Sequence, residues 1–536
     1  MLARIRTWLA GPTEGGYELV AAGERADDAR GQLAHPTAHH LATLPHVPAP
    51  IPAASYAIAL VEFAERASYY GVGGVFTNFI QRPLPPGGNG AGAPAPGSEA
   101  TPGALGRGLQ VSTALTGLFT LLAFTTPLAG GALADMRWGK FRTIVIGTAV
   151  AGVAHVVLVY AALPSVLQAE AAFTPFLASL LLLGGSTGLI KANIAPLMAE
   201  QYTPEGDYLA TLASGDKVIV DREATVQRIM SSYYHSINLG AFAAIASTFA
   251  EKYVGFWLAY LIPGAMFLLM PPVLYAVYPY LAPAPPPSSS PLVDAYHLAR
   301  RAIAARPGER AHASTDENDA SHALEACKLF AFFAVYNIAD GGLNSLMTSL
   351  AGSMTTHGIP NDVLEKANPF AIVVSIPLLN KFVYPALEAR RIPHGPVRRV
   401  VVGFVLAAAG MLWCALLQWA VYRSSPCGYA ATSCEEVSPL SAWLVLPAPL
   451  LAGLSESIAV VSALELAYTM SPPGLKSIVT SLFLFTQAIS AGIVLIFVPV
   501  MRDPALVWPF FLTAAFTTLA GVGVWKRFKY LDATPH

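Results

Sequence analysis

Apolar segments about as long as a bilayer is thick recur along the whole chain. A helix that crosses about 30 Å of hydrocarbon needs about 20 mostly apolar residues. Hydrophobic residues make up 54% of the 536 residues and charged residues only 12%, whereas a soluble domain carries about 25% charged residues. The sequence therefore predicts an all-α membrane protein with twelve transmembrane helices, over residues 54–80, 109–132, 141–163, 172–199, 229–250, 256–280, 324–351, 365–387, 398–422, 441–469, 475–500 and 506–526.

The first of these segments carries three charged residues close together, namely Glu62, Glu65 and Arg66. Charges at membrane depth are expensive, which predicts that these residues face a polar interior and have a function. Glu62 and Arg66 are four residues apart, so a helix places them on one face, where they can pair. A carboxylate held by a guanidinium can exchange that partner for a proton. The run therefore favours a coupling device over a membrane anchor.

Polar segments divide the chain into parts. A linker that is first rich in Pro and Ser and then charged separates six predicted helices from the next six. Lys and Arg gather in the short loops on one side, which the positive-inside rule assigns to the cytoplasm. We therefore expect both termini and the linker to be cytoplasmic. The predicted parts are an N-terminal tail (1–50), a first six-helix bundle (51–280), the linker (281–323), a second six-helix bundle (324–526) and a C-terminal tail (527–536).

Two of the four cysteines, Cys427 and Cys434, lie in a predicted loop on the extracellular side. Disulfides form in oxidising compartments, so this loop holds either a disulfide or two free thiols. No other His or Cys stands near them at a spacing typical of a zinc site. The sequence also shows no nucleophile triad and no phosphate-binding loop. We therefore expect no metal, no cofactor, no enzyme activity and no nucleic-acid partner.

Six plus six helices with a long cytoplasmic linker is the plan of the major facilitator fold, whose two six-helix halves enclose a midplane site. The segment GGALADMRWGKFR (130–142) resembles the loop motif between helices 2 and 3 of that superfamily. The resemblance implies a charge latch at the cytoplasmic gate, with Asp135 against helix ends or neighbouring basic residues. Arg137 and Lys140 would complete the latch. The alternative is an ordinary turn of the positive-inside kind.

The charged run itself resembles the signature of the proton-dependent oligopeptide transporter (POT/PTR) family, in its fungal-type form. It reads VEFAERASYYG over residues 61–71. Other segments resemble family motifs in the same order along both predicted halves, namely GGSTGLIKAN (184–193), SINLG (236–240), NP (368–369) and LELAYT (464–469). The resemblance implies a secondary transporter of the major facilitator superfamily.

The resemblance also implies roles for the residues at the matching positions. Proton coupling would use Glu62, Glu65, Arg66 and Lys191. Glu465 would receive the amino terminus of a peptide, because an ammonium group needs an anion in a dry site. The implied substrate-binding residues are Arg66, Tyr69, Tyr70, Lys191, Asn238, Asn368 and Glu465.

Each of these roles has a plainer alternative. Lys191 could extend from a helix end towards water. Glu465 could be a structural partner for another helix, and Asn238 and Asn368 could join helices by hydrogen bonds. Glu456, nine residues before Glu465, also lies within a predicted helix, and the sequence assigns it no function.

The seventh predicted helix departs from the family pattern. Bacterial members place a Glu there and fungal members an Asn-Gln pair, whereas Ile338 occupies the expected position. Asp340 is two residues further on, which is about 200° away around a helix. It is either a substitute acid or it faces elsewhere. This departure leaves the substrate range and the coupling details open.

Together these features predict a symporter that takes up di- and tripeptides with protons by alternating access. We expect it to work as a monomer in the lipid bilayer, in the plasma membrane, with protons as the coupling ion. One alternative is a symporter of another small anionic or peptide-like solute. A second is a peptide sensor that does not transport, built on a transporter scaffold.

Overall fold

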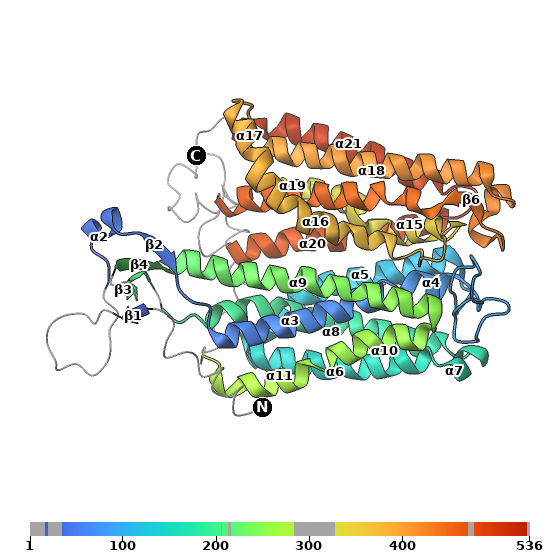
Figure 1. Ribbon diagram of the computed structural model, residues 1–536, viewed down its shortest axis with the longest axis horizontal. Helices are drawn as coiled ribbons and strands as arrows, with labels where there is room; N and C mark the ends of the chain where they lie inside the picture. The colour runs from blue at the N-terminus through green and yellow to red at the C-terminus, as the bar shows by residue number, and fades with distance from the viewer. Residues whose placement is uncertain are drawn as a thin grey trace, which may run out of the picture.

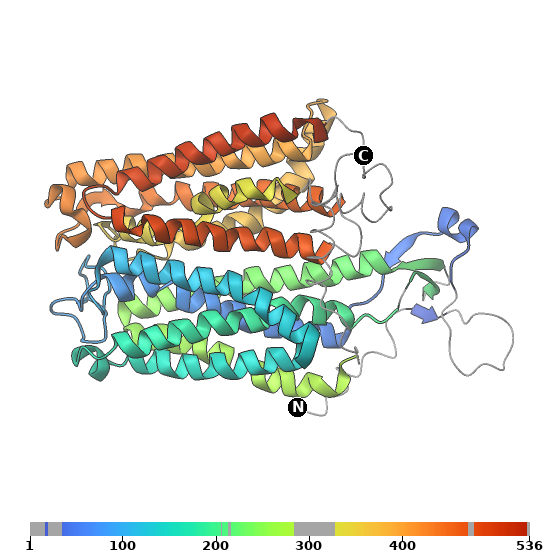
Figure 2. The same cartoon turned by 180° about the vertical axis from the view of Figure 1, so that it is seen from behind.

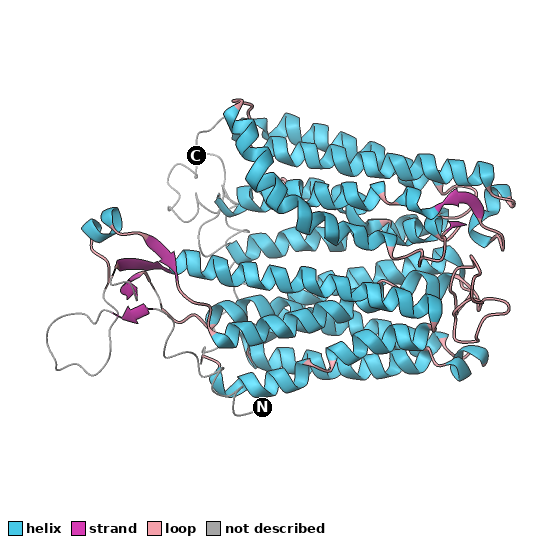
Figure 3. Ribbon diagram, viewed as in Figure 1, coloured by secondary structure: helices cyan, strands magenta, loops and turns pink. Residues whose placement is uncertain are grey.

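The computed structural model describes residues 17–19, 35–204, 206–212, 216–282, 327–469 and 476–532, most of which are helical (Figures 1 and 3). Within these residues, nine helices are long and apolar enough to cross a membrane. They coincide with nine of the twelve predicted spans and run over Gly108–Trp138, Lys140–Ala161, Phe173–Glu200, Phe256–Tyr280, Leu364–Ala389, Pro396–Ser424, Ala442–Ala467, Ser481–Val500 and Val507–Asp532.

The other three predicted spans also contain helices, but these are more polar or are interrupted. Helix α3 (Ala53–Gly73) carries the three charges of the signature run, and α9 (Arg222–Tyr253) is rich in Ser, Tyr and Asn. The third span holds α14 (Phe330–Asn337) and α15 (Asn344–Ala351), separated by the π-helical turn η4 (Ile338–Gly342). Most of the predicted linker and much of the predicted N-terminal tail lie outside the described residues.

Helices before residue 282 and helices after residue 327 form two groups that lie side by side (Figures 1 and 2). Each group has its own apolar core, rich in aromatic rings such as Phe79 and Phe256 in the first and Phe333 and Phe404 in the second. The helical backbone satisfies its own polar groups, as hydrocarbon requires. The first group also contains α4 (Phe76–Gln81), α5 (Gly108–Leu133), η1 (Ala134–Trp138), α6 (Lys140–Ala161), α7 (Pro164–Gln168), α8 (Phe173–Glu200), α10 (Phe256–Phe267), α11 (Met270–Val277) and η2 (Tyr278–Tyr280).

The second group is built in the same way around longer helices and short turns. Its elements beyond α14, η4 and α15 are η5 (Leu364–Lys366), α16 (Ala367–Leu378), η6 (Leu379–Val383), α17 (Tyr384–Ala389), α18 (Pro396–Ser424), η7 (Gly428–Ser433), η8 (Ala442–Val445), α19 (Pro447–Thr469), α20 (Lys476–Phe497), η10 (Val498–Val500), α21 (Val507–Phe528) and η11 (Lys529–Asp532).

A small sheet projects from one end of the first group (Figure 3). Its strand order is β1-β3-β4-β2, with β3 (Tyr208–Leu212) and β4 (Lys217–Asp221) forming an antiparallel hairpin between α8 and α9. Two strands from the predicted tail, β1 (Tyr17–Leu19) and β2 (His46–Pro48), pair with this hairpin. A helix, α2 (Ala38–Thr43), lies between them in sequence. The sequence did not predict this sheet, because its outer strands are only three residues long and their partners lie far along the chain.

The opposite end of the molecule carries the contacts that join the two groups. Gln81 at the end of α4 donates to Ser349 of α15 (2.8 Å), and Arg82 donates to the carbonyl of Gly352 (3.1 Å). The loop over residues 82–107 adds Thr101, which donates to the same carbonyl (2.9 Å). Strand β5 (Met354–Thr355) pairs with β6 (Ser438–Ser441) at this end of the second group. The two groups of helices are therefore held together at this end by hydrogen bonds between polar groups.

The cysteine loop of the second group lies at this end too. Cys427 and Cys434 are joined by a disulfide, with their Cα atoms 5.8 Å apart. The sequence left open whether this loop holds a disulfide or two free thiols, and the structure contains the disulfide. The carboxylate of Asp503 accepts hydrogen bonds from Tyr422 (2.6 Å) and from Thr432 (2.7 Å), which ties the loop to the neighbouring helices.

Candidate functional site

The three charges of the signature run are buried in the first group. Arg66 lies with its Nε 3.3 Å from Glu62 Oε1, and it also donates to Glu65. No more than 3% of any of these side chains is exposed. A Cβ atom on Gly240 of α9 would come within 2.7 Å of Arg66 Cβ, so glycine lets α9 pack directly on the run. Tyr233 of α9 interacts with Glu62 from the same side.

Lys191 of α8 belongs to the same cluster. Its ammonium lies over the ring of Phe124 on α5, with Nζ 3.8 Å from the ring centroid, and it interacts electrostatically with Glu62, Glu65 and Arg66. Such a cation–π contact stabilises a cation in a dry site by about 0.5–2 kcal/mol. The four residues expected to couple protons are therefore close neighbours in the fold.

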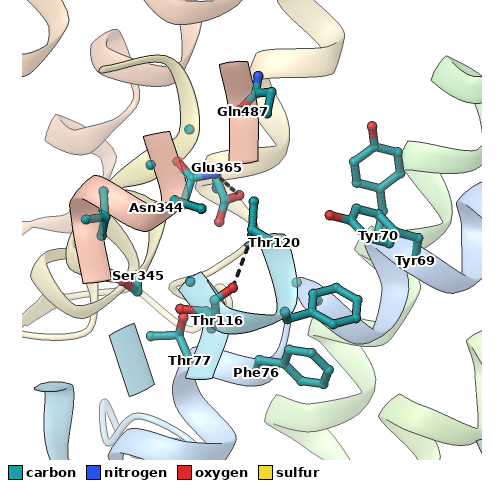
Figure 4. A pocket seen from close by; sticks show the side chains of 18 of the residues that line it. Tyr69, Tyr70, Phe76, Thr77, Thr116, Thr120, Asn344, Ser345, Glu365 and Gln487 are labelled. Carbon is teal, nitrogen blue, oxygen red and sulfur yellow. Dashed lines mark hydrogen bonds between the residues drawn. The ribbon is translucent and has the colours of Figure 1, made fainter. Parts of the chain in front are cut away.

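A cavity of about 260 Å³ separates the two groups of helices (Figure 4). Tyr69 and Tyr70 of α3 lie on one side of it, and Asn344, Glu365 and Gln487 lie on the other. Both tyrosines of the signature thus line the cavity. Pockets that hold small ligands combine apolar and aromatic walls with a few polar groups, and this cavity has that character.

Arg66 and Lys191 contact aromatic side chains that line the cavity. Phe124, which carries Lys191, is a lining residue, and so is Tyr69, whose ring centroid lies 4.9 Å from Arg66 Cζ. Arg66 and Lys191 therefore stand just behind the aromatic surface of this wall, together with Glu62 and Glu65.

The second group presents acidic residues instead. Asp340 lies in η4, directly before the lining residues Gly341 and Gly342. It interacts electrostatically with Glu456 of α19, and Glu456 in turn interacts with Tyr70, which lines the cavity from the first group. Because η4 is a π-helical turn, the α-helical angle used at the sequence level does not describe where Asp340 points. The sequence reasoning assigned Glu456 no function, and the structure brings it to the site.

The expected position of Glu465 in the cavity is wrong. Glu465 lies in the last turns of α19, where its Oε2 accepts a hydrogen bond from Arg399 Nη2 (3.0 Å) and its side chain is 52% exposed. Nine residues separate it from Glu456, which corresponds to about 13 Å along a helix. In the sequence, Glu456 lies between two serines in a run that also contains glycine, which is typical of close helix packing but does not identify the partner helix.

Asn238 and Asn368 are not among the described residues that line the cavity. Asn238 is half-buried and donates to the carbonyl of Tyr234 in its own helix (2.9 Å). Asn368 begins α16, where its carbonyl would lie 2.5 Å from a Cβ atom on Gly453. In this conformation Asn238 bonds within its own helix, and the Asn368 backbone packs against α19.

The polar residues that line the cavity and that the sequence did not indicate include Asn344, Glu365, Lys366 and Gln487. Asn344 donates to Glu365 (2.7 Å), and Lys366 Nζ lies 3.7 Å from the same carboxylate. The adjacent charges of Glu365 and Lys366 at the start of a predicted span were the available signal.

The latch motif lies at the end of the first group that carries the sheet. Lys140 at the start of α6 forms an ion pair with Glu200 at the end of α8. Asp135 in η1 interacts electrostatically with both, whereas Arg137 is exposed. Gly139 adopts a φ of 74°, which glycine tolerates and which lets the chain turn between η1 and α6. The latch thus joins α5, α6 and α8.

Comparisons with known proteins agree with this architecture. The sequence model of the POT family matches residues 141–307 and 290–516. The MFS-type transporter ucsM of Acremonium sp is 41% identical over 88% of this chain and 83% of its own length. The peptide transporter PTR2 of Candida albicans is 36% identical over 93% of this chain and 86% of its own length.

Solved structures share the fold at lower identity. An auto-inhibited POT family peptide transporter superposes with a TM-score of 0.71 at 18% identity, covering 89% of this chain and 97% of its own. A peptide transporter POT mutant in complex with alafosfalin gives a TM-score of 0.64 at 17% identity, covering 89% and 95%.

Proposed function

The chain belongs to the POT family, and from this membership and its site we propose that it carries small peptides across a membrane by alternating access. It is an integral membrane protein of a transporter family and not an enzyme. The proposal includes twelve spanning helices in two six-helix halves, residues 51–280 and 324–526, joined by a linker at 281–323. The tails, 1–50 and 527–536, would be cytoplasmic, as the basic loops indicate.

One observation carries the peptide assignment: buried charged groups of both signs surround the cavity. Arg66 and Lys191 stand behind the wall of the first group, and Asp340 and Glu456 stand on the second. A short peptide is a zwitterion, with a carboxylate at one end and an ammonium at the other. Charge-assisted hydrogen bonds in a dry site recognise these ends strongly. A cavity of about 260 Å³ suits di- and tripeptides, and contacts to the termini leave side-chain selectivity loose.

Proton coupling follows from the buried run on α3. Glu62 and Glu65 both lie at Arg66 Nε, so a substrate carboxylate must compete with two anions for the charge of this guanidinium. Protonation of one glutamate frees the guanidinium for the peptide. The proton is then the coupling ion, and no other cofactor is required. Monomeric function in the plasma membrane is part of the same proposal.

The test is uptake of a labelled dipeptide into proteoliposomes with an imposed inward proton gradient. We expect accumulation that an uncoupler abolishes and that Glu62→Gln lowers at least tenfold. Glu436→Gln, on an exposed loop acid, is the matched control and should accumulate peptide like the wild type. Accumulation that survives in Glu62→Gln would move coupling away from this residue. Absence of any uptake by folded protein would reject peptide transport.

A second candidate cargo is another small anionic or peptide-like solute. The relative with 41% identity is named only as an MFS-type transporter, and the helix 7 position of the family is Ile338 here. A panel of dipeptides should compete with one another for uptake if peptides are the cargo. Failure of every dipeptide to compete with a non-peptide solute would favour this second candidate.

A further inference from the structure

A second pair of buried carboxyl groups lies away from the cavity, where the two groups of helices meet. Glu251 ends α9 in the first group, and Asp362 precedes η5 in the second. Both side chains are fully buried, with 0% exposure, and the two carboxyl groups interact with each other. Two ionised carboxylates cannot donate to one another, so this contact requires a proton on one of them.

The hydrogen bonds around the pair support a shared proton. Asn78 of α4 donates to Glu251 Oε1 (2.7 Å) and exchanges hydrogen bonds with Asn361 (2.9 and 3.0 Å). Within the described residues, no other side chain donates to Glu251 Oε2 or to either oxygen of Asp362. A fully buried carboxylate oxygen without a donor is costly, and a proton between the two groups removes that cost.

Two lysines lie near the pair, and each of them is also close to another acid. Lys366 of η5 lies 3.7 Å from Glu365. Lys252 of α9 donates to Thr356 (3.1 Å), and it interacts electrostatically first with Glu99 of the 82–107 loop and then with Glu251 and Asp362. Each lysine therefore has an acid of its own, and the remaining neighbours, Asn78, Asn361 and Tyr260 of α10, are neutral. Burial raises the pKa of Asp362 to about 7, against the opposing effect of Lys366.

We propose that the Glu251–Asp362 pair binds one proton whenever this end of the molecule is closed, and thereby senses the pH outside. The site is distinct from the coupling run on α3, because it lies in the contact that must part when the closed end opens. The proposal rests on the proposed function for its orientation and for the alternation between open and closed ends.

The direction of the pH dependence follows from linkage. Opening exposes both carboxyl groups to water, where their pKa returns to about 4 and the shared proton leaves. Closure must therefore take up a proton at any pH above that value. Wherever the closed pair holds this proton and the open carboxyl groups are ionised, each unit rise in external pH lowers the ratio of closed to open molecules by up to about tenfold.

The experiment measures opening directly, without any cargo. Spin labels are placed at Ala169→Cys and Arg502→Cys, exposed positions at this end of the first and second groups. The free Cys327 and Cys414 are replaced by alanine, and the protein is studied in nanodiscs by electron–electron distance measurement. We expect a short distance at pH 5 and a growing population of longer distances towards pH 7.5.

Asp362→Asn and Glu251→Gln test the pair itself, because each keeps one carboxyl group and supplies a neutral donor in place of the proton. Either variant should hold the short distance at both pH values, with Glu436→Gln responding like the wild type. The proposal is overturned if wild-type distances do not respond to pH, or if both variants keep the wild-type response. Since no peptide is present, these results are independent of whether dipeptide uptake succeeds.

Discussion

Two glutamates on α19 show how strongly the surroundings of a residue decide its chemistry. Glu456 interacts with Asp340 and with Tyr70 beside the cavity, whereas Glu465 is half exposed and paired with Arg399. An exposed ion pair contributes about 0–1 kcal/mol, and a hydrogen bond to a charge in a dry site about 1.5–3 kcal/mol. A glutamate on the same helix therefore contributes a different free energy of interaction at position 456 than at position 465.

Glu456→Gln should raise the KM for dipeptide uptake about tenfold to a hundredfold, because the peptide ammonium loses a charged partner. Glu465→Gln is the matched control and should change KM less than about threefold. Concentration-dependent uptake into proteoliposomes measures both. Equal effects of the two variants would show that Glu456 does not bind the amino terminus.

At the scale of helices, small residues set how closely the elements approach. A Cβ atom on Gly188 of α8 would lie 2.1 Å from Thr126 Oγ1 of α5, and one on Gly130 would lie 2.5 Å from the Gly188 carbonyl. At neither of these two glycines is there room for a side chain. Gly185, three residues before Gly188, has no atom within 4 Å of the Cβ position. The glycines of one motif thus have different structural roles, and only some are required for packing.

Gly188→Ala should lower the free energy of unfolding by about 1–3 kcal/mol, because the added methyl group forces α5 and α8 apart. Gly185→Ala should leave stability unchanged or raise it slightly, since alanine favours the helix by up to about 1 kcal/mol. Thermal unfolding of both purified variants in detergent provides the comparison. A fall in Tm of equal size for both would contradict the packing argument.

At the scale of the whole molecule, hydrogen bonds between the two groups gather at the end opposite the sheet. They include Gln81 to Ser349, Arg82 to Gly352 and the Asn78–Asn361 exchange. Glu99 adds three more, because its carboxylate accepts from Thr356 and His357. Burial raises the pKa of Glu99. These hydrogen bonds lower it by more, so the pKa of Glu99 lies below its usual range. The proposed alternating access would require this network to break and reform in each cycle.

A cross-link at this end should therefore stop transport. Gln81→Cys with Ser349→Cys, oxidised to a disulfide, should abolish dipeptide uptake, and a reductant should restore it. The single variant Gln81→Cys controls for effects of the reagents on the native Cys427–Cys434 disulfide. Undiminished uptake by fully cross-linked protein would mean that this end does not open during transport.

The sequence by itself determined the class of protein and the chemistry of its most buried run. Apolar segments of bilayer length predict membrane helices because hydrocarbon admits few other structures, and nine spans agree within the described residues. Charges at i and i+4 on one helix predict a pair because helix geometry is local, and Glu62 lies beside Arg66. Motif order identified the family, which the relatives confirm.

Only the tertiary structure decided which residues from distant segments meet. Helical periodicity alone did not distinguish Glu456 from Glu465, because that choice depends on how α19 packs against α18 and η4. The sheet joins strands from the tail to a hairpin before α9, and Glu251 meets Asp362 from the other group of helices. Local sequence determines secondary structure and periodic faces, whereas contacts across segments follow from the packing of the complete chain.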